Sequence, residues 1–351
     1  MIEPRDDIAL MEGYHSPQVD VAVRLNTNEA PWPPPEGFRV ALGEAVAGVA
    51  WHRYPDRQAT KLRAKLAAHH GVDPSMVFVA NGSNEVLQLL CLAYGGAGRT
   101  VATFEPTYAL HSHIARLAGT EVAVGERGPG FEIDLDEVRS VLDVAQPAIT
   151  FLCSPNNPTG TIDPPEVLEA VLALAPGLVV VDEAYGQFAP RSAVADVAPG
   201  RPLVVVRTFS KTWSMAAARL GYCVAPPEVV EVLEKVALPY HLDATKQLAG
   251  EIALDFEAEM HARVAALVEE RGRLEATLAD LPVDVFPSGA NFILFRPRGR
   301  EGKDVWQGLL DRSVLVRDCS SWPRLEGCLR ITIGTPAEDD AFLAALTEVL
   351  T

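Results

Sequence analysis

Short apolar segments alternate with longer amphipathic ones through the middle of the 351-residue chain, and this alternation limits the fold more than any other feature. Strand-like runs bounded by Pro, Gly or polar residues occur at 76–80, 100–104, 148–154, 177–184 and 202–210. Their nearly continuous apolarity favours a parallel sheet that is covered on both faces. Helical stretches, several of which begin with proline, lie between them. The sequence therefore predicts an α/β fold with a mostly parallel central sheet flanked by helices.

The pattern changes on both sides of this region. Residues 26–38 are rich in proline and are expected to form an extended arm. After about residue 240, one long helical stretch over 246–281 leads into several short strands, which indicates a smaller α+β domain. We therefore expect an arm that also belongs to the small domain in 1–35, a large cofactor-binding domain in 36–239 and a small C-terminal domain in 240–351.

Composition and charge argue against several classes of protein. The formal net charge is −17, which opposes general nucleic-acid binding because neutralising phosphates requires a basic face. No apolar run approaches the length that spans a membrane, and the N-terminal stretch lacks the pattern of a signal peptide. Five scattered cysteines without a CxxC spacing indicate a reduced, cytoplasmic protein, and eight histidines show no metal-ligand pattern.

The glycine-rich stretch at 94–100, YGGAGRT, superficially resembles a nucleotide-binding loop. A dinucleotide fingerprint requires a strand, then glycines, then a helix. Here the glycines follow a predicted helix and precede a predicted strand, so we expect them to end that helix. The sequence therefore does not predict NAD binding.

Polar side chains follow four of the predicted strands, at the edge where open α/β sheets bind their ligands. The strand at 76–80 ends in NGSNE, the one at 148–154 in SPNNPTG, the one at 177–184 in DEAY and the one at 202–210 in SK. Together they provide an anion-binding helix start, an amide, a carboxylate, a phenol and an amine. This set suits pyridoxal 5'-phosphate, since a lysine can form a Schiff base with its aldehyde and a carboxylate can keep its ring nitrogen protonated.

Several of these segments resemble the class I/II aminotransferases of fold type I, namely SPNNPTG, VDEAYGQF and RTFSKTWSMAAARLGY. A narrower similarity, to histidinol-phosphate aminotransferases, lies in RLNTNEAP, RYPD, NGSNEVL, ANFILF and VRDCSSWPRLEGCLRITIGTPAED. The resemblance runs from about Tyr14 to the C-terminus. It implies transamination between L-histidinol phosphate and 2-oxoglutarate in histidine biosynthesis, which yields imidazole-acetol phosphate and glutamate.

The resemblance also implies roles for individual residues around the cofactor. Lys211 would form the Schiff base and shuttle the proton, and Asp182 would pair with the ring nitrogen. Asn157 and Tyr185 would hydrogen-bond the ring oxygen, and Tyr108 would stack on the ring. The cofactor phosphate would be held by Gly82, Ser83, Asn84, Ser210, Arg219 and, from a neighbouring subunit, Tyr54.

For the substrate, the resemblance implies Arg330 of LRIT, Arg317 of VRD and Tyr14. The planar guanidinium of arginine matches both carboxylate and phosphate, so one site could accept glutamate and a phosphate-bearing amine in turn. A tyrosine that reaches across to the neighbouring subunit implies a homodimer with shared active sites. The sequence departs from the family at NEAP, Asn84 and TWSMAAAR, and none of these changes removes a catalytic group.

Three other functions fit parts of the same pattern. An aromatic amino-acid aminotransferase would use the same cofactor site, and so would a threonine-phosphate decarboxylase, which would release CO₂. A cofactor-sensing regulator on this fold would need a basic DNA-binding module, and the sequence has no basic, helix-rich extension.

Overall fold

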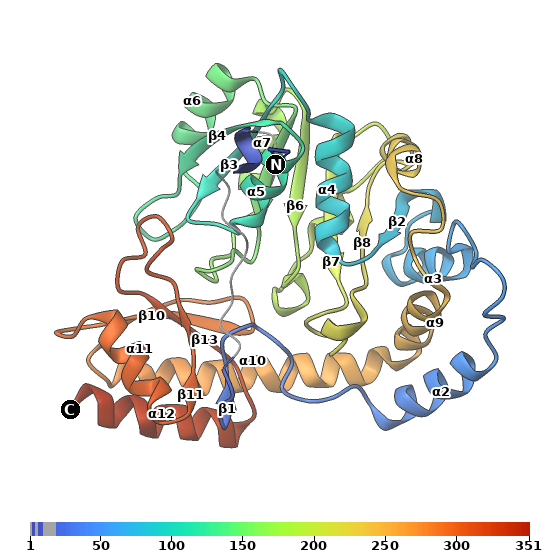
Figure 1. Cartoon of the computed structure of the whole chain (residues 1–351). Helices are drawn as coiled ribbons and strands as arrows, with labels where there is room; N and C mark the ends of the chain where they lie inside the picture. The colour runs from blue at the N-terminus through green and yellow to red at the C-terminus, as the bar shows by residue number, and fades with distance from the viewer. Residues whose placement is uncertain (1, 4–5, 10–18) are drawn as a thin grey trace.

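The structure is a computed structural model that describes residues 2–3, 6–9 and 19–351 (Figure 1). A seven-stranded sheet forms its centre, in the order β2-β8-β7-β6-β5-β3-β4. The strands are β2 (Val77–Ala80), β3 (Thr100–Glu105), β4 (Glu121–Glu126), β5 (Ile149–Cys153), β6 (Leu178–Asp182), β7 (Leu203–Thr208) and β8 (Gly221–Val224). Only β8 runs antiparallel to its neighbours within this sheet, so the predicted mostly parallel sheet is confirmed.

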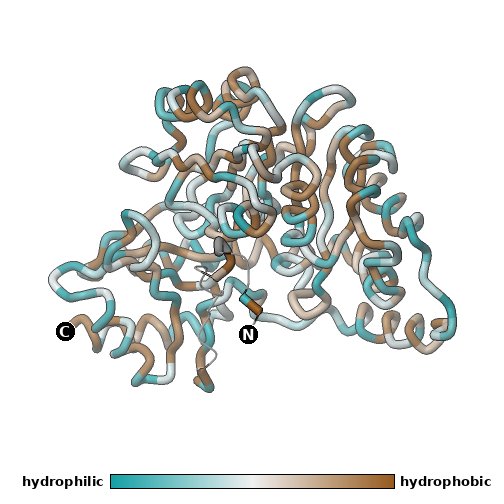
Figure 2. The backbone as a smooth tube through the Cα atoms, turned by 45° about the horizontal axis from the view of Figure 1, so that its top comes forward, coloured by the Kyte–Doolittle hydropathy of each residue, from teal (hydrophilic) through white to brown (hydrophobic). Residues whose placement is uncertain are grey.

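Hydrophobic clusters cover both faces of this sheet, as its continuous apolar strands predicted. Along β6, Val180 belongs to one cluster, whereas Val179 and Val181 belong to another, because successive side chains point to opposite faces. The first cluster includes side chains of α4 (Ser83–Tyr94), α5 (Leu110–Leu117) and α8 (Pro227–Val236). The second includes side chains of α3 (Thr60–His70), α6 (Leu135–Ala145) and α7 (Pro165–Leu174). Figure 2 shows hydrophobic and hydrophilic residues alternating along the helices, as expected of elements with one buried face.

The sequence analysis missed two strands of the central sheet. β4 is an edge strand whose Glu121, Val124 and Glu126 are exposed, so it does not read as an apolar run. β8 has only four residues and follows directly on the lysine-bearing segment, which has no helical or strand period of its own. The glycines at 95–98 do lie between the end of α4 and the start of β3, as predicted.

A second, antiparallel sheet has the order β12-β13-β10-β9. Its strands are β9 (Val283–Phe286), β10 (Phe292–Pro297), β12 (Arg317–Asp318) and β13 (Leu329–Thr332), and the helices beside it are α11 (Gly302–Leu310) and α12 (Pro336–Leu350). The N-terminal arm joins this half of the molecule, since β1 (Val23–Arg24) pairs with β11 (Val314–Leu315). That pairing agrees with the expected place of the arm, and the domain limits themselves stay a prediction.

The prediction of one continuous helix over 246–281 is wrong. The chain forms α9 (Ala244–Ala253), a 3₁₀ turn at Leu254–Phe256 and then α10 (Glu257–Ala279). The break allows α9 to pack on α2 (Glu36–Ala47) and α3, while α10 runs beneath both sheets along the bottom of Figure 1. Phe256 of the turn packs edge-on against Phe38 at 6.3 Å, so residues 36–38, expected in the extended arm, belong instead to a packed helix. A short helix, α1 (Asp6–Ala9), precedes these elements.

Candidate active site

A cavity of about 770 Å³ opens between the carboxyl ends of the central strands and the four-stranded sheet. Most of the residues predicted from sequence line it, namely Ser83, Asn84, Tyr108, Asn157, Asp182, Tyr185, Ser210, Lys211, Arg219, Arg317 and Arg330. Those of the central sheet lie at or after the carboxyl ends of separate parallel strands, which meet at one edge of the sheet, whereas Arg317 and Arg330 lie on β12 and β13. The structure therefore brings together in one cavity groups that are up to about 250 residues apart in the sequence.

Lys211 follows β7 and reaches into the cavity. Its Nζ donates a hydrogen bond to the carbonyl oxygen of Thr27 at 3.0 Å and lies 5.8 Å from the centre of the Tyr185 ring. Burial lowers the pKa of the Lys211 amine to about 7, and Arg330 acts in the same direction while Glu29 opposes it. A large fraction of the amine is therefore unprotonated near neutral pH, which is the form that acts as a nucleophile or base.

Asp182 ends β6 and is only 2% exposed. Its Oδ2 lies 3.1 Å from Nε2 of His111, and its Oδ1 accepts a hydrogen bond from the backbone N–H of Ala184 at 3.0 Å. The His111 ring stacks on Phe151 of β5 at 4.8 Å, so both partners hold the carboxylate in one orientation. This contact of His111 was not predicted from the sequence, where the histidines show only the absence of a metal-ligand pattern. Its place one helical turn after Tyr108 was the available signal.

The first turn of α4 lies beside the Arg219 guanidinium, and we call this group the α4 cradle. Gly82 precedes the helix with a φ of +85°, and a Cβ atom built there would lie 3.0 Å from Nη2 of Arg219. Arg219 also donates to Oγ of Ser210 at 3.4 Å, and the Tyr108 hydroxyl donates to Oδ1 of Asn84 at 3.3 Å. Free backbone N–H groups and the helix dipole favour a negative charge at this end of the helix. The α4 cradle therefore combines the dipole of the helix with the positive charge of the Arg219 guanidinium.

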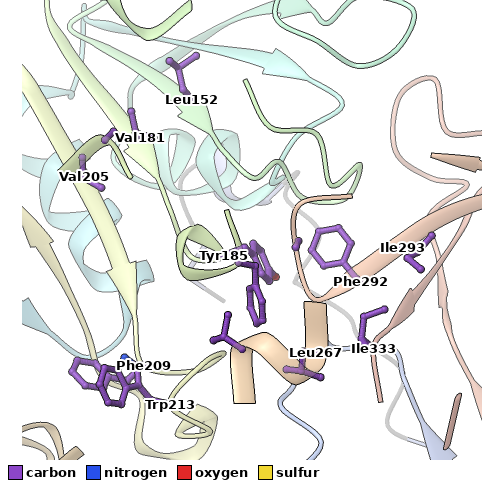
Figure 3. Close-up of a cluster of buried hydrophobic side chains, with 14 of the residues drawn as sticks. Leu152, Val181, Tyr185, Val205, Phe209, Trp213, Leu267, Phe292, Ile293 and Ile333 are labelled. Carbon is purple, nitrogen blue, oxygen red and sulfur yellow. The ribbon is translucent and has the colours of Figure 1, made fainter. Parts of the chain in front are cut away.

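Tyr185 lies at the junction of the two sheets (Figure 3). Its ring packs edge-on against Phe292 at 5.0 Å, and its hydroxyl oxygen accepts a hydrogen bond from Nδ2 of Asn28 at 2.8 Å. Burial raises the pKa of the Tyr185 phenol to about 12, so the hydroxyl keeps its proton near neutral pH. It is therefore available as a hydrogen-bond donor towards the cavity.

Three consecutive residues of the N-terminal arm each contact a different predicted site residue. The carbonyl oxygen of Asn26 accepts from Nη2 of Arg330 at 3.0 Å. The next two residues bind Lys211 and Tyr185 as described above. Arg330 also donates to Oδ1 of Asn157, so the arm and the two sheets hold the arginine together. Sequence reasoning missed these arm contacts, because no spacing rule relates positions so far apart.

Arg317 lies on β12, and its guanidinium carbon is 5.2 Å from the centre of the Trp322 ring. Tyr54 is not part of the cavity within this chain. Its side chain is 80% exposed and stacks on Tyr240 at 4.5 Å. Tyr14 lies outside the described residues.

Two further observations limit the chemistry of the described part of the chain. It contains no group of three His, Cys, Asp or Glu side chains that could hold a metal ion. None of its helices combines the length and apolarity needed to span a bilayer. The cysteines, at positions 91, 153, 223, 319 and 328, are all buried free thiols.

Fold and site together define an aminotransferase. A family model described as aminotransferase class I and II matches residues 20–346, and the chain belongs to this family. Over 99% of its length it is 46% identical to the histidinol-phosphate aminotransferase of Frankia casuarinae, 90% of which is covered. It is also 45% identical to the histidinol-phosphate aminotransferase of Streptomyces avermitilis, over 98% of this chain and 96% of that protein.

A solved structure shares the same fold. The histidinol-phosphate aminotransferase of Sinorhizobium meliloti, determined in complex with pyridoxal-5'-phosphate, superposes with a TM-score of 0.91. The match covers 100% of this chain and 98% of that one at 23% sequence identity, so it bears on the fold. The seven-stranded sheet with a small antiparallel sheet is accordingly the fold-type I arrangement that the resemblance implied.

Proposed function

We propose that this protein is a pyridoxal-phosphate-dependent histidinol-phosphate aminotransferase, which transfers the amino group of L-histidinol phosphate to 2-oxoglutarate in histidine biosynthesis. One observation carries the proposal most directly. The lining of one cavity includes Lys211 together with two groups that suit anions, the α4 cradle with Arg219 and the pair Arg317 and Arg330, and this supports the proposal. One group suits a cofactor phosphate and the other suits the phosphate of the substrate. The name shared by close relatives supports the same reaction.

The residues of the cavity fit pyridoxal 5'-phosphate. A side chain at position 82 would crowd Arg219, so the glycine leaves the cradle open for a phosphate. Asp182 would hold the ring nitrogen, Asn157 and Tyr185 the ring oxygen, and Tyr108 the ring face. The remaining phosphate partners would be Ser83, Asn84 and Ser210. When bound, this cofactor supplies an electron sink for the negative charge that develops on the substrate α-carbon.

Lys211 acts as the general base and acid in this proposal. Its lowered pKa leaves the amine free to take the proton from the substrate α-carbon near neutral pH. A positioned group of this kind contributes roughly 10²–10⁴-fold to the rate of proton transfer. Asp182, oriented by His111 and by the Ala184 N–H, keeps a fixed negative charge at the far end of the site.

Arg330 and Arg317 bind the anionic end of each substrate. Both line the cavity wall that belongs to the four-stranded sheet, and Arg330 is only 6% exposed. A guanidinium offers paired N–H donors to a phosphate or a carboxylate, so the same wall can serve both half-reactions. We assign Tyr14 of the arm to this substrate group as well.

The proposal also includes a homodimer with shared active sites in the cytoplasm. Tyr54 would complete the phosphate cradle of the neighbouring subunit. Its exposure, together with that of Trp51 (69%) and Leu238 (77%), supports a contact surface on this side of the molecule. The scattered, reduced cysteines support the cytoplasmic location.

Near-ultraviolet and visible absorbance of the purified protein tests this function. L-histidinol phosphate should convert the cofactor band to that of its aminated form, and 2-oxoglutarate should restore it. A response to phenylalanine but not to L-histidinol phosphate would indicate an aromatic amino-acid aminotransferase instead. Release of CO₂ from threonine phosphate, without formation of a keto acid, would indicate a threonine-phosphate decarboxylase.

Lys211→Ala should abolish turnover and the cofactor band of the wild-type protein. Lys235→Ala, on α8 and remote from the cavity, is the control and should retain both. A normal cofactor band in Lys211→Ala would contradict the site assignment.

A further inference from the structure

The turn that joins β12 to β13, residues 319–328, forms part of the cavity wall. Ser321, Trp322 and Pro323 of this turn line the cavity beside Arg317. In Figure 1 it is the orange-red loop that rises from the four-stranded sheet towards β3 and β4. Its tip therefore lies between the two halves of the molecule rather than at the free edge of its own sheet.

Backbone hydrogen bonds give this turn a defined shape. The N–H of Cys319 donates to the carbonyl of Cys328 at 3.0 Å, which closes the base of the turn. Within it, the N–H of Trp322 donates to the carbonyl of Cys319 at 3.0 Å, and the N–H of Leu325 donates to that of Trp322 at 3.2 Å. These bonds couple the position of residues 323–325 to that of the Trp322 backbone.

Arg324 fastens this turn to the other half of the molecule. Its guanidinium donates to the carbonyl of Arg127, just after β4, and to that of Gly128 at 2.9 Å. Arg127 is itself only 3% exposed and is bound to Asp163 at 3.2 Å, so the acceptor segment is well anchored. Two charge-assisted bonds to fixed carbonyls make a directional attachment.

Apolar packing accompanies this attachment. Phe131, from the same acceptor segment, is 4% exposed and belongs to a small cluster with Cys319, Leu325 and Cys328 of the turn. The Arg324 guanidinium carbon lies 5.9 Å from the Phe131 ring centre. Phe131 holds a φ of +66°, a strained conformation that a bulky residue keeps only where its surroundings enforce it.

Trp322 links the fastened turn to the substrate site. Its side chain packs against the same cluster, and the Arg317 guanidinium carbon lies 5.2 Å from the centre of its ring. Stacking on an aromatic face fixes the orientation of a guanidinium. The position of Arg317 in the cavity therefore depends on the ring of Trp322.

We propose that Arg324 and Trp322 are positioning residues for the phosphate of the substrate, acting together through Arg317. Arg324 fastens the turn to the Arg127–Gly128 segment, and the turn presents Trp322 as a platform for the guanidinium. This inference rests on the proposed function. It adds to that function the residues that make the site select an amine with a phosphate over an amine without one.

Binding in the Lys211→Ala background, which cannot turn the ligand over, tests the inference. Calorimetry gives the Kd of L-histidinol and of L-histidinol phosphate, and the ratio of the first to the second isolates the contribution of the phosphate to affinity. Arg324→Leu and Trp322→Leu should each reduce this ratio about tenfold, since a hydrogen bond to a charged group typically contributes that much. Trp322→Phe, which keeps an aromatic face, should restore most of it.

Two comparisons separate positioning from general damage. Arg298→Leu removes an exposed arginine directly after β10, which does not line the cavity, and should leave the ratio unchanged. The double variant Arg324→Leu/Trp322→Leu should lose no more than the larger single effect, because both residues act through Arg317. Melting temperatures of all variants identify any that are simply unfolded.

The outcomes distinguish this inference from the proposed function. If L-histidinol phosphate and L-histidinol lose affinity equally in Arg324→Leu and Trp322→Leu, the turn is only structural and the inference is wrong. If the ratio falls while wild-type protein fails to transaminate L-histidinol phosphate, the positioning device stands and the proposed reaction is wrong. A phosphate that adds no affinity even with the native turn would overturn the inference.

Discussion

Gly82 shows how a single residue conditions the cofactor site. Its φ of +85° suits glycine, and a Cβ atom there would meet the Arg219 guanidinium at 3.0 Å. A side chain would therefore both strain the turn into α4 and displace a cation from the anion cradle. With a ψ of 165°, this conformation costs a residue other than glycine about 1–3 kcal/mol.

Gly82→Ala should weaken binding of pyridoxal phosphate by about tenfold or more, because strain and loss of the Arg219 position act together. Titrating cofactor-free protein and following absorbance measures the Kd. Gly43→Ala is the matched control, since Gly43 lies in α2 and a Cβ there meets nothing within 4 Å. Equal affinities for the two variants would show that Gly82 does not shape the cradle.

His111→Phe should lower kcat about tenfold while leaving substrate KM little changed. Phenylalanine keeps the stacking on Phe151 and removes the Nε2 contact with Asp182, so the carboxylate loses one orienting partner. Steady-state kinetics with L-histidinol phosphate gives both constants. His261→Phe, at a 61% exposed position, serves as control, and an unchanged kcat in His111→Phe would remove the orienting role.

At the scale of the elements, α12 buries a carboxyl group, that of Asp339, on which Glu270 of α10 also acts. Asp339 is fully buried and accepts a hydrogen bond from the Gly334 N–H at 3.0 Å. Burial raises the pKa of the Asp339 carboxyl to about 8, whereas hydrogen bonds from Arg273 lower that of Glu270. The Asp339 carboxyl therefore keeps its proton at neutral pH.

Asp339→Asn should stabilise the protein increasingly as the pH rises from 5 to 8. The unfolded chain releases the Asp339 proton near pH 4, whereas the folded chain keeps it to about pH 8. Between these values the folded state binds the extra proton, so wild-type stability falls with rising pH by up to about 1.4 kcal/mol per unit. Asparagine keeps the acceptor and has no proton to lose.

Thermal unfolding from pH 5 to 8 follows this effect as a widening difference in Tm between variant and wild type. Asp143→Asn, at an exposed position on α6, should show no such trend. A Tm difference that does not depend on pH would mean that Asp339 is already ionised in the folded protein.

At the scale of the whole molecule, the proposed dimer predicts complementation between two inactive subunits. A mixed dimer of Lys211→Ala and Tyr54→Ala chains has one site with both native residues if Tyr54 acts on the neighbouring subunit. Random pairing of equal amounts should then restore about a quarter of the wild-type activity. Coexpression with two affinity tags isolates the mixed species. No recovery would place Tyr54 outside the neighbouring site.

Local patterns predicted the parts of the site that follow buried strands. Asp182 and Lys211 each come directly after a run of apolar residues, so their place at the sheet edge was readable from the sequence. Asn28, His111 and Arg324 were not predicted. Their contacts join residues 71 to 197 positions apart, and no periodicity or spacing relates such pairs.

The sequence by itself determined the α/β class, the central parallel strands and the polar strand ends, because hydrophobic periodicity and strand-end chemistry are local properties. Only the tertiary structure decided where α9 breaks from α10, how the arm crosses Lys211, and which turn supports Arg317. These depend on how two sheets, a long helix and an extended arm pack together. The contacts that stabilise this packing form between surfaces that exist only in the folded chain, so local sequence patterns do not predict them.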